Sequence, residues 1–319
     1  MDRREFLVTA GVAAVSLGHS PTGLGGRVGG TSLAYVTADL ESHVVVLELG
    51  TGEIRKRIRT GPGPRSIESV HDRFAVVAHT DHGAVTILDA ATGRIRFELD
   101  DFAAPRYTAV HPRTPLAYVT DSEREEIVVV DASQGRVVGR ARVPGPARHL
   151  AVSRDGRTIW TALGTAAARL AVLDPSDPRR PALVRTFSAP FLAHDVGFTP
   201  DGSAAWVTSG AEPRVAVYRH GRPVQLLDAG APPQHVTFAR TKVFVSSGDD
   251  GSVRRHRPDG VLVREARVPI GSYNVTFAWN RLVTPSLTRG TLSVLDRNAR
   301  VSTVVQAARA AHDACVLNI

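Results

Sequence analysis

The sequence predicts an all-β fold, a seven-bladed β-propeller of four-stranded antiparallel blades. Three observations support this prediction: a repeat of 38 to 45 residues that recurs seven times, short runs rich in Val, Ile, Leu and Thr, and glycine-containing turns between those runs. A period near 40–45 residues with four short strands is typical of propeller blades. After the first 22 residues, no apolar period of 3.6 residues lasts long enough to predict a helix.

The register of the repeat is set by the end of the third run in each unit. These ends fall at Glu48, Asp89, Asp131, Asp174, Arg219, Arg257 and Asp296. The first unit starts at Ala34 with a run that is second in the other units, whereas the C-terminal residues 313–317 match the first runs. We therefore predict that the C-terminal strand joins the N-terminal blade and closes the ring, which leaves no open sheet edge there.

The composition is that of one globular domain, which we place at residues 33–319. The chain has 319 residues, 43% of them hydrophobic, and a formal net charge of +8. The arginines are scattered and form no long basic run, so we do not expect nucleic acid as a partner. The single cysteine, Cys315, excludes an internal disulfide and any CxxC metal or haem motif. We expect a monomer.

The amino terminus has the pattern of an export signal, which we assign to residues 1–22. Arg3 and Arg4 precede an apolar stretch at residues 8–17, too short for a membrane span. The pair followed by Phe6 and Leu7 resembles a twin-arginine signal, although Asp2 departs from that pattern. A general secretory signal or an uncleaved anchor is the alternative. A Gly-rich linker at residues 23–32 follows, and we expect an exported protein (periplasmic, cell-surface or secreted) without a transmembrane span once mature.

Three short motifs connect the repeats to a known family. Residues 35–37 and 118–120 read Tyr-Val-Thr, and residues 206–208 read Trp-Val-Thr. Over residues 33–319 the chain resembles the YVTN-type propeller repeat family, with the family's Asn replaced by Ala38, Asp121 and Ser209. The resemblance implies the propeller fold. It leaves function open, because propellers include binding proteins, lyases, lactonases and dehydrogenase subunits.

Polar residues gather at the start of the predicted inner strands, three and four positions before a shared apolar residue. Since these starts and the loops between second and third strands open on one face, we predict a polar funnel at one mouth of the channel. The candidate ligand-binding residues are Arg106, Tyr107, Arg148, His149, His194, Asp195, His235, Tyr273, Asn274, His312 and Asp313. Arg106 and Arg148 are candidate anion clamps, or else solvated or salt-bridged arginines.

The histidines of the funnel also predict a divalent metal as candidate cofactor. Neutral imidazoles that converge from different blades suit such an ion, and the candidate ligands are His149, His194, His235 and His312. The alternative is that these polar residues cap strand backbone and hydrate the channel.

Three functions are compatible with this pattern. The first is an exported binding or scaffold protein that takes a small ligand or protein partner at the channel mouth. The second is a metal-dependent hydrolase or lyase, acting on a lactone or cyclic ester through the funnel histidines. The third, implied only by the family resemblance, is a propeller subunit of a periplasmic dehydrogenase.

Overall fold

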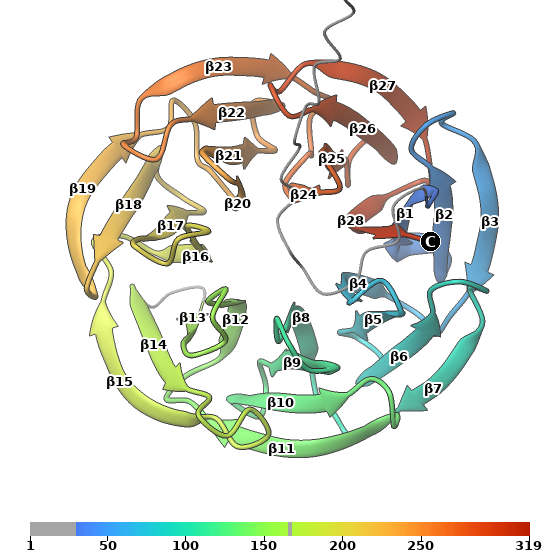
Figure 1. Cartoon of the computed structure of the whole chain (residues 1–319), viewed down its shortest axis with the longest axis horizontal. Coiled ribbons are helices and arrows are strands. Elements are labelled where there is room, and N and C mark those ends of the chain that lie inside the picture. Colours follow the sequence, from blue (N-terminus) through green and yellow to red (C-terminus); the bar gives the residue numbers. More distant parts are fainter. Residues whose placement is uncertain (1–29, 165–167) are drawn as a thin grey trace, which may run out of the picture.

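The computed structural model describes residues 30–164 and 168–319, and these form a closed ring of seven four-stranded antiparallel sheets. Figure 1 shows the sheets arranged as blades around a central axis, with one strand of each blade next to that axis. The predicted fold class is therefore confirmed. The predicted export signal and most of the predicted linker lie outside the described residues.

Each blade runs from an innermost to an outermost strand, and the chain passes through the blades in order. Blade 1 contains β28 (Ala311–Asn318), β1 (Ser32–Ala38), β2 (His43–Glu48) and β3 (Ile54–Arg59). Blade 2 contains β4 (Pro64–Val70), β5 (Phe74–His79), β6 (Ala84–Asp89) and β7 (Ile95–Leu99). Blade 3 contains β8 (Pro105–Val110), β9 (Leu116–Asp121), β10 (Glu126–Asp131) and β11 (Arg136–Arg142). Blade 4 contains β12 (Ala147–Val152), β13 (Ile159–Leu163), β14 (Arg169–Asp174) and β15 (Ala182–Ser188).

The remaining blades follow the same scheme. Blade 5 contains β16 (Ala193–Phe198), β17 (Ala205–Ser209), β18 (Arg214–Arg219) and β19 (Arg222–Asp228). Blade 6 contains β20 (His235–Ala239), β21 (Lys242–Ser247), β22 (Ser252–His256) and β23 (Leu262–Arg267). Blade 7 contains β24 (Thr276–Ala278), β25 (Arg281–Pro285), β26 (Thr291–Asp296) and β27 (Val301–Gln306). A 3₁₀ turn, η1 (Asp39–Glu41), joins β1 to β2. Third strands end where the repeat predicts, except that β22 ends at His256, one residue before Arg257.

The ring closes as predicted, because β28 pairs with β1 in blade 1. Tyr35 lies opposite Cys315 in this antiparallel pair. The pairing extends beyond β1, since the N–H of Thr31 donates to the carbonyl of Ile319 at 2.8 Å. Residues 31 and 32, which the sequence placed in the linker, thus belong to the propeller. The N-terminal blade depends on both ends of the described chain.

The core consists of apolar side chains between neighbouring blades. The two Tyr-Val-Thr tyrosines add a polar contact there: the hydroxyl of Tyr35 donates to the carbonyl of Ala90 at 2.7 Å, and that of Tyr118 donates to the carbonyl of Pro178 at 3.0 Å. Both acceptors belong to the next blade along the chain. The apolar faces of each sheet are thereby covered on both sides, which a single blade could not achieve. Within the described residues, no helix has the length and apolarity needed to cross a membrane.

Candidate functional site

The inner strands depart from regular pleating where they begin. In β12 the pairing with β13 shifts between Ala147 and Leu150, and in β16 the pairing with β17 shifts between Ala193 and Val196. Extra residues of this kind bend a strand and redirect its side chains. In β16 the two consecutive residues His194 and Asp195 therefore both contribute to the channel mouth, where strict alternation would have separated them.

A buried threonine of the second strand holds the irregular start of the inner strand. The hydroxyl of Thr208 accepts the N–H of Asp195 at 3.1 Å and donates to the carbonyl of Gln234 in the next blade at 2.9 Å. The hydroxyl of Thr37 accepts the N–H of Asp313 at 2.9 Å in the same way. These threonines end the motifs at residues 206–208 and 35–37. Since they satisfy backbone groups that the shifted register leaves free, the motif stabilises the site as well as the blade.

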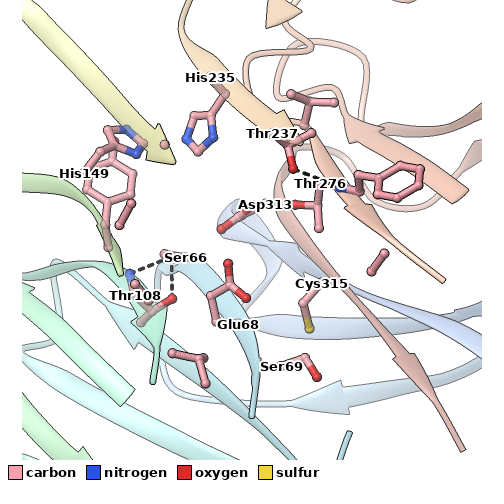
Figure 2. Close-up of a pocket in the computed structure, with 18 of the residues that line it drawn as sticks. Ser66, Glu68, Ser69, Thr108, His149, His235, Thr237, Thr276, Asp313 and Cys315 are labelled. Carbon is pink, nitrogen blue, oxygen red and sulfur yellow. Dashed lines mark hydrogen bonds between the residues drawn. The ribbon is translucent and has the colours of Figure 1, made fainter. Parts of the chain in front are cut away.

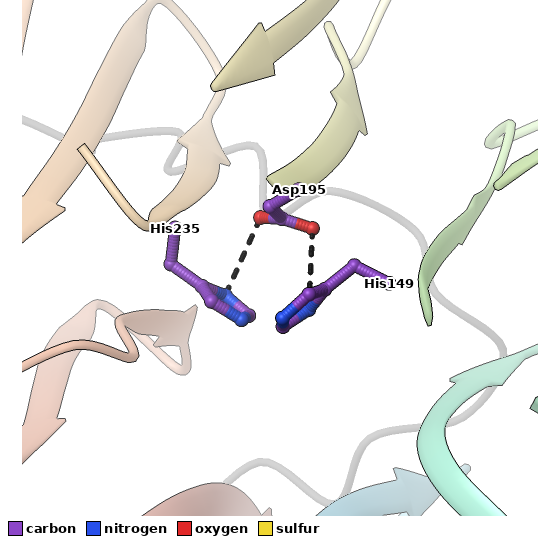
Figure 3. A group of neighbouring side chains, drawn as sticks. All are labelled: His149, Asp195 and His235. Carbon is purple, nitrogen blue, oxygen red and sulfur yellow. Dashed lines mark ion pairs between the residues drawn. The ribbon is translucent and has the colours of Figure 1, made fainter. Parts of the chain in front are cut away.

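Three of the predicted residues form a compact cluster at the start of β12, β16 and β20. One candidate metal-ligating atom from each of His149, Asp195 and His235 lies within 4.8 Å of the other two. Figure 3 shows the carboxylate of Asp195 facing both imidazoles: its oxygens lie 3.6 Å from Nδ1 of His149 and 3.4 Å from Nδ1 of His235. The same carboxylate accepts the N–H of Val236 at 2.9 Å. The Nε2 atoms of both histidines are buried and have no hydrogen-bond partner among the described residues.

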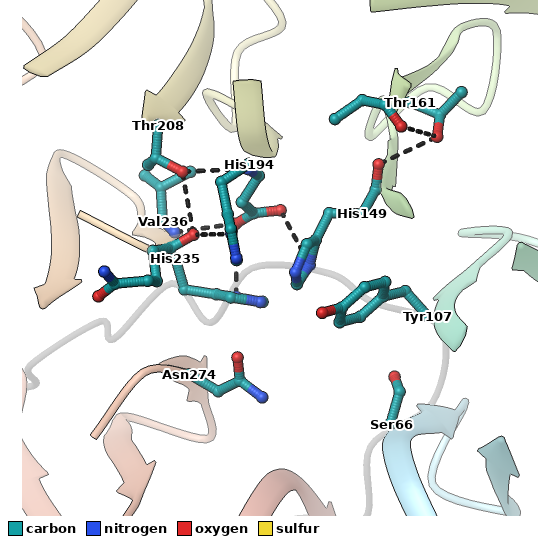
Figure 4. A network of polar contacts seen from close by, with 12 residues as sticks. Ser66, Tyr107, His149, Thr161, His194, Thr208, His235, Val236 and Asn274 are labelled. Atoms are coloured by element: carbon teal, nitrogen blue, oxygen red, sulfur yellow. Dashed lines mark hydrogen bonds and ion pairs between the residues drawn. The ribbon is translucent and has the colours of Figure 1, made fainter. Parts of the chain in front are cut away.

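His194 lies beside this cluster with its ring nitrogens in defined roles. Its Nδ1 donates to the carbonyl of Gln234 at 2.8 Å, which leaves Nε2 as the acceptor nitrogen of a neutral ring. Its ring centroid lies 4.6 Å from that of His149 and 6.4 Å from that of His235, and the latter two centroids are 4.4 Å apart. Figure 4 shows the three imidazoles of blades 4, 5 and 6 gathered at the mouth. Three of the four histidines predicted as metal ligands are thus brought together.

Burial sets the ionisation of the cluster. It lowers the pKa of His235 to about 4 and that of His194 to about 3, and it lowers the pKa of His149 well below the ordinary value, with the neighbouring histidines adding to the effect. Burial also raises the pKa of Asp195 to about 7, partly offset by the amide of Val236. At neutral pH the three imidazoles are therefore uncharged, and their lone pairs are available to a ligand.

Tyr107 and the arginines continue the site around the mouth. The ring of Tyr107 stacks on that of His149, with centroids 3.4 Å apart, and the guanidinium of Arg106 lies 6.0 Å from the centroid of Tyr107. Arg148 precedes His149 in β12, and the Nε atoms of both arginines are buried without a hydrogen-bond partner from residues 30–164 and 168–319. The arginines predicted as anion clamps thus lie next to the histidines.

The other predicted site residues have different surroundings. The Nδ1 of His312 lies 3.0 Å from a carboxylate oxygen of Asp39, and among the described residues its ring makes no stacking contact with the three clustered imidazoles. Asn274 donates to the carbonyl of His312 at 2.9 Å, and Asp313 accepts the N–H of Ile67 at 3.0 Å, so both side chains join neighbouring blades. Tyr273 packs on Gly248, where an added Cβ would lie 2.2 Å from the ring. None of the four belongs to the compact group of His149, Asp195 and His235, although Asp313 lines the same cavity and the charges of Asp313 and His312 act on the pKa of His235.

A cavity of about 480 Å³ extends along the channel from the cluster. Figure 2 shows its wall, to which His149 and His235 contribute at one end and Glu68, Asp313 and Cys315 further along. Phe238, Phe277 and Trp279 line it as well. The cavity therefore offers polar groups beside the histidines and aromatic surface further along.

The sequence prediction missed two polar side chains of β4: Glu68, which lines the cavity, and Arg65, whose charge acts on Arg106. Arg65 is the second residue of β4, as Arg106 and Arg148 are of β8 and β12, but β4 is one residue longer, so Arg65 lies five positions before the shared apolar residue instead of four. The recurring Pro-Arg pair at residues 64–65 and 105–106 was the available signal. Glu68 occupies a register whose other members are mostly apolar, and it carries no sequence signal of its own.

Comparisons with known proteins agree on the fold. No family model and no curated protein matches the sequence. The hydrazine synthase structure of Kuenenia stuttgartiensis superimposes with a TM-score of 0.71 at 15% identity, covering 81% of this chain and 90% of the other. A functionally unknown protein from Desulfotomaculum acetoxidans superimposes with a TM-score of 0.77 at 13% identity, covering 90% and 99%. At such identities the likeness shows a shared seven-bladed architecture, and the function has to be argued from the site.

Proposed function

We propose that this propeller is an exported, metal-dependent ligand-binding protein, with a divalent transition metal held at the channel mouth by His149, His194 and His235. The export rests on the Arg3-Arg4 signal pattern of the sequence. Zinc is the ion we would test first, because uncharged imidazoles are preferred zinc ligands.

The observation that carries this proposal is the orientation of the imidazoles. Nδ1 of His149 and His235 faces the shared carboxylate of Asp195, and Nδ1 of His194 faces the carbonyl of Gln234. Metal-binding histidines commonly have such an acceptor at one nitrogen, which directs the other nitrogen to the ion. The buried Nε2 atoms of His149 and His235 lack a hydrogen-bond partner in the part of the chain that the structure describes, which is unfavourable unless something binds them.

The spacing of the rings also fits one ion. Three imidazoles that share a tetrahedral zinc at about 2.0–2.1 Å place their ring centroids about 5 Å apart. The separations of 4.4 and 4.6 Å involving His149 lie close to that value, and the separation of 6.4 Å between His194 and His235 is longer. Binding would then require the latter two rings to approach each other by roughly 1 Å, a small side-chain movement.

Three histidine ligands leave one position of a tetrahedral site for a ligand. His149 and His235 line the 480 Å³ cavity, so a molecule there could reach that position with an oxygen atom. The aromatic residues further along the cavity would contact an apolar part of the same molecule. This division of the channel favours a small ligand at the mouth over a protein partner.

The test is stoichiometric zinc binding. Purified protein, stripped with a chelator and titrated with Zn²⁺, is expected to bind one equivalent and to unfold at a higher temperature when loaded. The double variant His149→Ala/His235→Ala should lose both effects. The matched variant His82→Ala/His220→Asn replaces two exposed histidines outside the cluster and should keep them. Zinc, manganese and nickel all leaving the unfolding temperature of the parent protein unchanged, with no bound ion, would sink the proposal.

A hydrolase or lyase acting on a lactone is the second candidate, favoured by Asp195. Burial raises the pKa of this carboxyl to about 7, a value suited to proton transfer at neutral pH. Incubation of the zinc-loaded protein with simple lactones tests it, with His149→Ala/His235→Ala as the inactive control. Zinc binding without turnover of any lactone would reject the enzyme function and retain the ligand-binding function. For the third sequence hypothesis, a dehydrogenase subunit, no contact of the described residues provides support.

A further inference from the structure

Three arginines occupy the same place in three neighbouring blades. Arg65, Arg106 and Arg148 are each the second residue of an inner strand, in β4, β8 and β12. All three fall where the strand register shifts, so their side chains leave the regular alternation of the sheet. They form a cluster, called here the arginine triad, around the mouth next to the histidines of blades 4 to 6.

No carboxylate of the described residues lies within ion-pair distance of the triad. Each Nε of its three guanidinium groups is buried without a hydrogen-bond partner among the same residues. Two other arginines with limited exposure do form ion pairs: Arg254 contacts Asp250 and Glu265, and Arg140 contacts Glu126 and Asp101. The three side chains are half-buried, so their Nε atoms are shielded from solvent while the rest of each guanidinium group can still reach a ligand at the mouth.

The three charges act on one another and on the histidines. Burial lowers the pKa of Arg106, Tyr107 beside it partly offsets this effect, and the charges of Arg65 and Arg148 lower the pKa further. Burial is also the main cause of the low pKa values of His149 and His194, to which Arg148 and Arg106 add. The pKa of Asp39 is lowered chiefly by its hydrogen bond with His312, and the charge of Arg65 adds to this effect. The mouth therefore has a positive potential beside the cluster proposed to hold a metal.

We infer that the arginine triad binds an oxyanion, the carboxylate or phosphate group of the small ligand that the histidine site receives. Guanidinium groups match the geometry of both anions and bind them through paired N–H donors. Tyr107 lies between Arg106 and His149, so the anion and the metal position would be neighbours at one mouth. The inference rests on the proposed function for the identity of the ligand, but anion binding by the triad is measurable without metal.

The experiment is calorimetric titration with inorganic phosphate and, in a second arm, with acetate, at constant ionic strength set by sodium chloride. It is run on chelator-treated and on zinc-loaded protein. We expect saturable binding of at least one anion in both states, weakened about tenfold for each arginine removed in Arg106→Gln/Arg148→Gln. The control Arg113→Gln/Arg154→Gln makes the same charge change at exposed arginines of the same two blades and should bind as the parent does.

A second readout guards against a variant that does not fold. Because the triad is a cluster of like charges, Arg106→Gln/Arg148→Gln should unfold at a higher temperature than the control in anion-free buffer. Should the double variant be unfolded by circular dichroism, the single change Arg65→Gln takes its place. Preference for phosphate over acetate identifies the anion class.

The outcomes separate this inference from the proposed function. Anion binding that is lost in the triad variants while no zinc binds would retain the triad and overturn the metal site. Zinc binding with no saturable binding of either anion, or with equal binding by parent and triad variants, would overturn the triad alone.

Discussion

Glu68 is a carboxyl group whose surroundings oppose its ionisation. It extends from β4 into the channel wall, where burial, and then repulsion from Asp313, raises its pKa from 4.5 to about 8 (Figure 2). In the unfolded chain the group ionises near its ordinary value, whereas in the folded protein it keeps its proton until about pH 8. Between these values the folded state binds more protons than the unfolded state, so the free energy of unfolding decreases as pH rises.

The change Glu68→Gln should remove this dependence. We expect the variant to gain stability over the parent as pH rises from about 4.5 to 8, by at most about 1.4 kcal/mol per pH unit, and the difference to stay constant above that range. Urea unfolding at pH 5, 6, 7, 8 and 9 measures it. Glu123→Gln, at an exposed loop position, controls for the loss of one negative charge. Parallel stability curves for Glu68→Gln and the parent would contradict the assigned ionisation.

At the scale of the element, the Tyr-Val-Thr strand explains how a blade forms and how it positions the site. Its tyrosine donates a hydrogen bond to a backbone carbonyl of the next blade, and its threonine accepts a backbone N–H at the irregular start of the inner strand. The threonine of blade 1 and that of blade 5 also donate to carbonyls in the following blade, those of Arg65 and Gln234. Only the blade 5 contact lies beside the histidines, because Gln234 also accepts from His194.

This difference gives a matched pair of variants. Thr208→Val and Thr37→Val keep the side-chain shape but leave a buried N–H and a carbonyl without their hydroxyl partner, which costs about 1–3 kcal/mol of stability in each case. We expect both variants to lower the unfolding temperature similarly. Only Thr208→Val should weaken zinc binding, because it removes the hydroxyl contacts to the N–H of Asp195 and to the Gln234 carbonyl that holds His194. Chemical unfolding and zinc titration measure the two effects. Equal zinc affinities in the two variants would show that the threonine does not position the histidines.

The closed ring depends on the pairing of β28 with β1. β28 is the innermost strand of blade 1, and the carboxylate of its Asp313 accepts a hydrogen bond from the backbone N–H of Ile67 in blade 2. Without β28, the inner edge of β1 would expose unpaired backbone, and the contact between blades 7 and 1 would be lost. Ring closure is therefore a condition for the stability of every blade.

Deletion of residues 313–319 should abolish the cooperative thermal transition and make the protein aggregate, as followed by circular dichroism and size-exclusion chromatography. A circular permutant supplies the control. It joins Ile319 to Gly30 through a short turn, which the adjacent pairing of Thr31 with Ile319 permits, and places new ends between β27 and β28. We expect it to unfold like the parent. A truncated chain that melts as cooperatively as the parent would show that closure contributes little.

Much of the candidate site was predictable, and the remainder had a physical obstacle. His149, Asp195 and His235 share a register in the aligned inner strands, and the structure brings these three side chains together. Arg65 fell outside the aligned positions because β4 has one residue more than β8 and β12, and the different surroundings of His194 and His312 do not follow from the position that they share. The ligand set depends on which rings approach closely, and His312 turns instead to Asp39. The period of a repeat does not determine the distances between side chains of different blades.

The number of blades, the order of strands and the exchange of strands at the closing blade follow from the sequence alone. These features depend on the side-chain alternation of strands and on turn residues, and both are local properties of the chain. Only the tertiary structure decided which polar side chains meet at the mouth. Register shifts turn neighbouring residues toward the same space, and the curvature of the ring brings blades 4, 5 and 6 close enough for their imidazoles to touch. Both effects arise from the packing of blade against blade, which no single repeat encodes.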